Sequence, residues 1–103
     1  MSTIEKLAAT IAARASASPD SSYTAKLLGA GIDKCAKKFG EEAVELVLAA
    51  ASRDMAHTAQ EAADVIYHML VLLQASGVSL ADVEKVLATR EAMSGLEEKA
   101  RRG

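Results

Sequence analysis

Two groups of acidic residues are spaced so that their carboxylates could hold metal ions. The first group is Glu41, Glu42 and Glu45, and the second is Glu61 and Asp64. Both lie in segments with the apolar periodicity of an α-helix, where residues three or four apart share a face. On a helical wheel Glu45 lies about 60° from Glu42, and Glu41 about 100° from it. Leucines flank this strip on both sides, so we expect its carboxylates to face into a helical assembly.

The second acidic group lies in a segment, 55–76, that is apolar on nearly every side of the predicted helix. A helix that is hydrophobic all round is a buried helix. Carboxylates in such a place are costly unless a cation pairs with them. Residues 55–76 include no lysine or arginine. We therefore predict that a bound divalent cation neutralises Glu61 and Asp64 together with Glu42 and Glu45.

The donor set indicates which ion and which chemistry to expect. Carboxylate oxygens alone suit hard cations, Mg²⁺ first and Mn²⁺ as an alternative. Such ions polarise phosphoryl oxygens and activate water, which is the chemistry of phosphoanhydride hydrolysis. A redox di-iron bundle would need Glu-x-x-His pairs, but Glu45 follows Glu42 and Asp64 follows Glu61 at that spacing. A plain solvated acidic face is the structural alternative.

Basic residues lie close to the acidic strip. Lys38 falls within the strip on the helical wheel and Lys34 lies one turn earlier. They either contact substrate phosphates or form salt bridges on an exposed helix face, worth a few tenths of a kcal/mol per pair. Further basic candidates are Lys26, Lys37 and Arg53.

Two histidines fall near the Asp64 face of the same helix. His68, one turn beyond Asp64, is predicted to contact the metal ligands or the substrate, the alternative being a satisfied interior histidine. His57, near the start of the helix, is expected to take no part. They are eleven residues apart, roughly 16 Å along the axis, so they cannot both bind one ion.

Composition and charge limit the class of protein. The 103 residues predict a single domain, 1–103, with a modest core. A net charge of −2 provides no basic field for nucleic acid. No apolar run reaches the ~20 residues of a membrane span, and the N-terminus lacks the apolar core of a signal peptide. The expectation is a cytoplasmic protein in which the lone Cys35 is a small core residue.

The predicted fold is all-α, with five helices over about 3–15, 23–30, 32–52, 55–76 and 80–92. Gly31 and Gly77 are good C-cap residues, Asp54 is a good N-cap, and Ser79 with Asp82 forms a capping box. One chain of this size cannot cover helix 55–76 on all sides. We therefore predict a homodimer whose paired long helices form a four-helix core.

Several motifs resemble one enzyme family. The pattern Glu41-Glu42-x-x-Glu45 followed by Glu61-x-x-Asp64 resembles the metal-binding signature of the all-α, MazG-like nucleotide pyrophosphatases. The flanking motifs are similar to the phosphoribosyl-ATP pyrophosphatases of histidine biosynthesis. They are Ser22-Tyr23-Thr24-x-Lys26-Leu27-Leu28, Gly31-Ile32-Asp33-Lys34, Glu61-Ala62-Ala63-Asp64-x-x-Tyr67-His68, Gly77-Val78-Ser79-Leu80 and the tail Ser94-Gly95-Leu96-Glu97-Glu98-Lys99.

This resemblance implies Mg²⁺-dependent hydrolysis of phosphoribosyl-ATP to phosphoribosyl-AMP and pyrophosphate, the second step of histidine biosynthesis. It implies metal ligation by Glu42, Glu45, Glu61 and Asp64, with Glu41 binding a further ion or helping to activate water. The absence of a zinc-binding Cys/His set predicts a monofunctional chain. Two alternatives remain: a housekeeping pyrophosphatase for non-standard NTPs or dUTP, and a non-enzymatic helical dimerisation module.

Overall fold

The structure is a computed structural model that describes residues 1–93 together with residues 99 and 102. Its five helices are α1 (Thr3–Arg14), α2 (Tyr23–Ala30), α3 (Ile32–Ala51), α4 (Met55–Ser76) and α5 (Leu80–Glu91). The described residues include no strand, so the all-α prediction is confirmed. Residues 94–98 of the predicted tail motif lie outside the described part.

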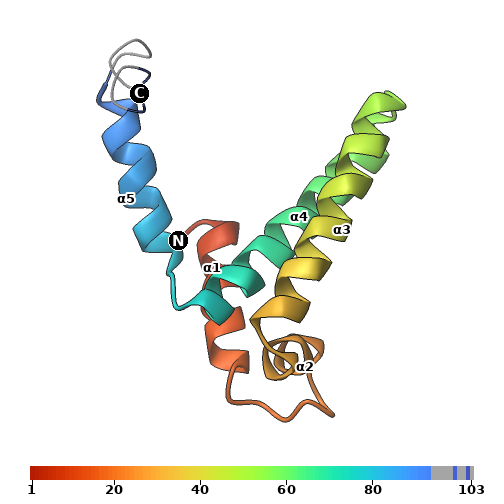
Figure 1. The fold of residues 1–103 in the computed structure, drawn as a ribbon, viewed down its shortest axis with the longest axis vertical. Helices are drawn as coiled ribbons and strands as arrows, with labels where there is room; N and C mark the ends of the chain where they lie inside the picture. The colour runs from red at the N-terminus through yellow and green to blue at the C-terminus, as the bar shows by residue number, and fades with distance from the viewer. Residues whose placement is uncertain (94–98, 100–101, 103) are drawn as a thin grey trace.

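The helices are arranged as a V (Figure 1). One arm is the long hairpin of α3 and α4, which pack against each other along their length. The other arm is α5, and α1 and α2 lie at the base, where both contact α4. The chain thus places the acidic segments of α3 and α4 side by side within one arm.

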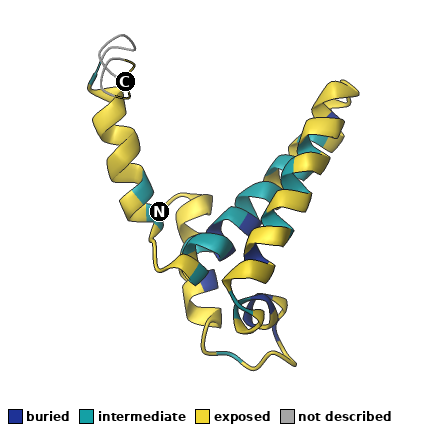
Figure 2. Ribbon diagram, viewed as in Figure 1, coloured by how far each residue is buried: buried dark blue, intermediate teal, exposed yellow. Residues whose placement is uncertain are grey.

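The hydrophobic core lies at the base of the V, where α1, α2 and the adjoining parts of α3 and α4 meet (Figure 2). Its buried members are Ile11, Leu27, Cys35, Leu70 and Val71. The Cys35 thiol donates a hydrogen bond to the Leu27 carbonyl over 3.3 Å and is almost fully buried. Cys35 is therefore a core residue, as predicted, and it ties α3 to α2.

The helix ends follow the predicted capping residues. Gly31, between α2 and α3, has φ +99°, and Gly77, after α4, has φ +75°. The Asp54 side chain accepts a hydrogen bond from the His57 N–H at the start of α4. Ser79 and Asp82 form the reciprocal capping box of α5. The junctions that orient α3 and α4 are thus set by local sequence.

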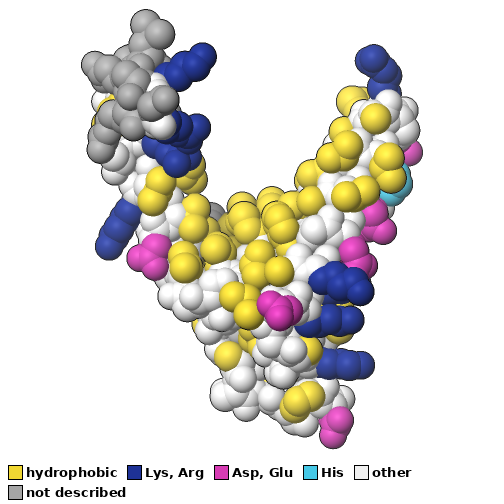
Figure 3. Space-filling view, viewed as in Figure 1, with side chains coloured by type: hydrophobic (Ala, Val, Ile, Leu, Met, Phe, Trp, Pro, Cys, Tyr) yellow, Lys and Arg dark blue, Asp and Glu magenta, His cyan; other side chains and the backbone are white. Residues whose placement is uncertain are grey.

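As expected for a single chain of this size, α4 is only partly covered. Its end near the base is buried, but Ala63 and Asp64 are exposed, because α1, α2 and α3 cover only part of its circumference in one chain. Hydrophobic side chains remain uncovered along the inner side of the V (Figure 3). On the α3–α4 arm the exposed hydrophobic side chains include Val44 at 58%, Val47 at 65% and Leu48 at 64% exposure.

Within the described residues, no single helix has the length and hydropathy needed to cross a membrane. The pair α4 and α5 meets those two criteria only when counted together, and it is bent by 107° at the break.

The left-handed residue after α4 generates a stability prediction. Gly77→Ala should lower the free energy of unfolding by about 1–2 kcal/mol, because an L side chain is strained in this conformation. Gly29→Ala, at an exposed position inside α2 with open space around the added methyl, should raise it by up to about 1 kcal/mol. Thermal or urea unfolding measures both, and equal effects of the two substitutions would contradict the assignment of Gly77 as the C-cap.

Candidate active site

Three of the predicted metal ligands come together between α3 and α4. Glu42, Glu45 and Glu61 each offer a carboxylate oxygen, and these oxygens all lie within 4.8 Å of one another. Glu42 and Glu45 are three residues apart on α3, and Glu61 faces them from α4. We call these three side chains the acid cluster. Asp64, the fourth predicted ligand, lies outside the cluster but close enough for its charge to act on Glu42.

The acid cluster is partly enclosed. The side chains of Glu42 and Glu61 are 17% and 15% exposed, whereas Glu45 and Asp64 are exposed. In the single chain these carboxylates are thus only partly enclosed, and their expected place inside a helical assembly depends on the predicted homodimer. The second carboxylate oxygen of Glu61, Oε2, is buried and has no hydrogen-bond partner among the described residues.

The electrostatics of the cluster are unfavourable without a cation. Burial raises the pKa of Glu42 above its ordinary value of 4.5, and a hydrogen bond and the charge of Glu45 raise it further. The charges of Asp64 and Glu61 act in the same direction. Glu42 is therefore the acid whose ionised form most needs a positive partner.

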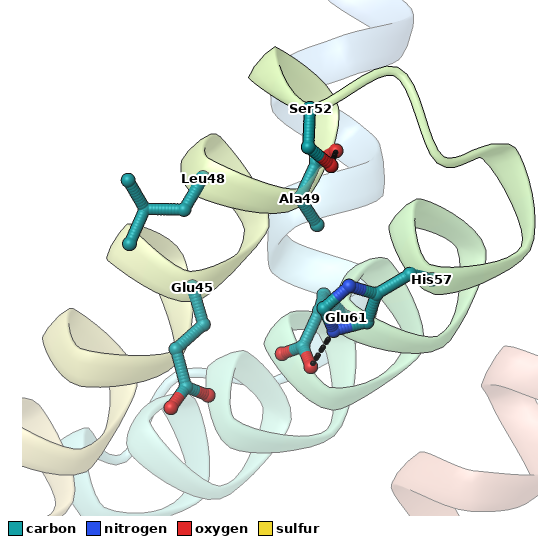
Figure 4. Close-up of a pocket in the computed structure, with 6 residues that line it drawn as sticks. All are labelled: Glu45, Leu48, Ala49, Ser52, His57 and Glu61. Atoms are coloured by element: carbon teal, nitrogen blue, oxygen red, sulfur yellow. Dashed lines mark hydrogen bonds and ion pairs between the residues drawn. The ribbon is translucent and has the colours of Figure 1, made fainter.

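A histidine that we expected to be a bystander contacts the acid cluster. His57 Nε2 lies 3.2 Å from Glu61 Oε1, one helical turn apart on α4 (Figure 4). Both side chains line a cavity of about 320 Å³. The remaining residues of its lining are Glu45, Leu48, Ala49 and Ser52. The i, i+4 spacing of His57 and Glu61 was the signal in the sequence that could have identified this pair.

His68 lies on the other side of the cluster. It is buried, and its Nε2 is 3.8 Å from Glu42 Oε1. Burial lowers the pKa of His68, as does the charge of Lys38, while Asp64 and Glu41 act in the opposite direction. Its Nδ1 has no hydrogen-bond partner among the described residues. Glu41 itself is exposed on α3 and is not one of the three clustered acids.

The predicted phosphate-contacting lysines line a second cavity. Lys34 and Lys38 border a pocket of about 260 Å³ at the junction of α2 and α3, together with Lys26 and the ring of Tyr23. Lys37 and Arg53 do not line it. In Figure 3, basic side chains follow acidic ones along the outer edge of the α3–α4 arm.

The residues present fit a divalent cation. The donors are all carboxylate oxygens, which Mg²⁺ and Mn²⁺ prefer, and their separation of at most 4.8 Å allows one ion to contact all three. Within the described part of the chain, Glu61 Oε2 is a buried acceptor to which no hydrogen bond is donated. Buried acceptors without partners are rare in folded proteins, and a cation would satisfy this one.

Comparisons with known proteins assign the chain to one enzyme family. The profile of the phosphoribosyl-ATP pyrophosphohydrolase family matches residues 4–91. A phosphoribosyl-ATP pyrophosphatase of Cereibacter sphaeroides is 58% identical over the whole of both chains. Phosphoribosyl-ATP pyrophosphatases 1 of Rhodopseudomonas palustris and Bradyrhizobium diazoefficiens are each 59% identical over 97% of this chain and 94% of their own.

The range matched by the family profile, residues 4–91, reaches from α1 to the end of α5 and contains the positions of the acid cluster. The chain therefore belongs to the phosphoribosyl-ATP pyrophosphohydrolase family.

Proposed function

We propose that this chain hydrolyses phosphoribosyl-ATP to phosphoribosyl-AMP and pyrophosphate, in histidine biosynthesis. The observation that carries the proposal is the acid cluster, whose carboxylate oxygens lie within 4.8 Å of one another on two packed helices. The names of the full-length relatives supply the substrate. A cytoplasmic location, expected from the sequence, is part of the proposal. A single domain, 1–103, would suffice for this reaction.

The proposed cofactor is Mg²⁺, with Mn²⁺ as a substitute. Glu42, Glu45 and Glu61 would hold it, with Asp64 as a fourth ligand or as the ligand of a second ion. When bound, such an ion lowers the barrier by polarising phosphoryl oxygens and making water a better nucleophile. The carboxylates of the chain fix its position relative to the substrate.

The remaining residues are assigned by position. Glu41, exposed next to the cluster, would accept a proton from the attacking water or hold a further ion. His68, kept neutral by burial, would offer a hydrogen bond to the substrate. Lys34 and Lys38, which line the neighbouring pocket, would contact substrate phosphates.

The test is release of pyrophosphate by the purified protein, measured with and without Mg²⁺. Phosphoribosyl-ATP, dUTP and ITP are compared at equal concentration. We expect Mg²⁺-dependent turnover with a strong preference for phosphoribosyl-ATP. Equal rates with the three substrates would instead support a housekeeping pyrophosphatase, and no release with any of them would refute the enzymatic proposal.

The ligand assignment predicts a loss of turnover. Glu61→Gln or Asp64→Asn should lower kcat/KM at least about tenfold, a loss of ~1.4 kcal/mol of transition-state stabilisation, because each removes a charged ligand without changing side-chain shape. Glu84→Gln, an exposed acid on α5, is the matched control and should retain full activity. A variant that keeps most of its activity loses its assignment as a ligand.

The raised pKa of Glu42 predicts how stability depends on pH when no divalent cation is present. Between 4.5, its ordinary value, and its raised pKa, the folded protein holds a proton that the unfolded chain has lost. Stability contributed by this group is therefore lost as pH rises through that window. Glu42→Gln should raise the melting temperature in EDTA at pH 7 and flatten its pH dependence, while Glu84→Gln leaves both unchanged.

The same variants distinguish the effect of carboxylate repulsion on stability from the effect of metal binding. Mg²⁺ at 100 times its Kd should stabilise the wild-type protein by about 2.7 kcal/mol, because it binds only the folded state. Glu42→Gln should lose most of this stabilisation. Calorimetry with and without Mg²⁺ measures it, and an equal gain in both proteins would place the ion elsewhere.

We also propose that the protein is a homodimer. Val44, Val47 and Leu48 of α3 are more than half exposed, and α4 is incompletely covered. Burying a valine or leucine side chain contributes about 1.5–3 kcal/mol, so pairing two α3–α4 hairpins is favourable. The paired hairpins would form the four-helix core.

The proposed dimer predicts the effect of a charge in this surface. Val47→Glu should convert the dimer to a monomer at micromolar concentration, because each copy would then bury an unpaired carboxylate in the interface. Ala13→Glu, on the exposed side of α1, should leave the oligomeric state unchanged. Sedimentation velocity reports both, and a Val47→Glu protein that remains dimeric would place the interface on another surface.

A further inference from the structure

The pocket between α2 and α3 has a lining that suits an anion held without a metal. Three of its side chains are lysines, namely Lys26 of α2 with Lys34 and Lys38 of α3. The remaining lining is Tyr23, Leu27 and Ala30. None of the described carboxylates borders the pocket, in contrast to the acid cluster farther along α3. We call it the lysine pocket.

The lysine pocket and the acid cluster are connected through His68. The Tyr23 ring, at the rim of the pocket, is 6.4 Å from the His68 ring, edge to face. The charge of Lys38 lowers the pKa of His68, and His68 Nε2 lies 3.8 Å from Glu42 Oε1. Lys34 precedes Glu42 by eight residues of α3, which is about 12 Å along the helix axis. One extended ligand could therefore contact both sites.

The proposed substrate carries phosphate at two ends, and the two ends require different binding groups from the protein. The triphosphate must lie at the acid cluster, because the bond to be broken needs the cation there. The phosphoribosyl group ends in a phosphate monoester, which adenine and two riboses separate from the triphosphate. Carboxylates repel a bare phosphate, whereas lysines attract it without an intervening ion.

We propose that the lysine pocket binds the 5′-phosphate of the phosphoribosyl group, with Lys26 and Lys34 as its contacts. This rests on the proposed function and deepens it. Lys38, the lysine nearest to Glu42 along α3, lies between the two sites. Tyr23, a residue that is 54% exposed, provides an apolar ring surface for the adjoining ribose. Nucleotides without a phosphoribosyl group would leave Lys26 and Lys34 without a partner, so the pocket selects substrate.

The first test measures binding without turnover. Ribose 5-phosphate, ribose and Mg²⁺-pyrophosphate are titrated separately into the full chain, and backbone amide shifts are followed by NMR. Ribose 5-phosphate should shift the amides of Tyr23, Lys26 and Lys34, and ribose should not. In Lys26→Gln/Lys34→Gln its affinity should fall at least about tenfold, because hydrogen bonds to a charged group are worth that much or more. Pyrophosphate affinity should change less than twofold.

The matched control is Lys37→Gln, which removes a lysine of α3 that does not border the pocket. It should bind ribose 5-phosphate with wild-type affinity. Equal weakening in Lys37→Gln and in the double variant would mean general electrostatic attraction and would overturn the proposal. A parallel loss of pyrophosphate binding in the double variant would assign the pocket to the triphosphate and would also overturn it.

The second test uses kinetics. With phosphoribosyl-ATP, the double variant should show KM raised at least about tenfold and kcat changed less than twofold, because the monoester is remote from the reacting bond and contributes uniform binding. An unchanged KM overturns the proposal. If the wild-type protein does not hydrolyse phosphoribosyl-ATP but binds ribose 5-phosphate at these lysines, the proposed function fails and the phosphate-monoester site stands.

Discussion

Mutual repulsion of carboxylates across the α3–α4 interface is the constraint on which the rest of the structure depends. Two unit charges about 4.8 Å apart repel by about 3 kcal/mol at an effective dielectric constant near 20. The core at the base of the V offsets this cost by holding the hairpin together from below, through Cys35, Leu70 and Val71. The acids can therefore remain close together, in an arrangement that the proposed cation would neutralise.

Local sequence predicted the helices and their ends because each signal acts within a few residues. Gly31 and Gly77 adopt positive φ angles that favour glycine. The Asp54 and Ser79 side chains each accept a hydrogen bond from the backbone N–H group three residues later. The spacing of three residues also predicted that Glu42 and Glu45 share a face of α3. Their pairing is the part of the acid cluster that a single helix determines.

Properties that depend on how helices rotate against each other were less predictable. Helix α4 is apolar in sequence around Asp64, yet Asp64 is exposed in one chain, because its neighbours cover only part of the helix. The contact of His57 with Glu61 was not predicted, although its spacing is local, because a residue near the start of a helix can turn its side chain either to solvent or to the next turn. The approach of Tyr23 to His68 joins α2 to α4, and no periodicity within one helix encodes it.

The lysines near the acid cluster do not neutralise it. Among the described residues, the ion pairs of Glu42 and Glu61 within 4 Å are with His68 and His57, and none is with Lys26, Lys34 or Lys38. A histidine with a lowered pKa, as burial gives His68, carries little charge at neutral pH and leaves the carboxylate ionised. A lysine in its place would be a permanent counterion and would compete with a divalent cation. Because the lysines line a separate pocket, the carboxylates of the acid cluster have no permanent counterion among them. The 20-residue helix α3 can therefore present an acidic site and a basic site to the two ends of the proposed substrate.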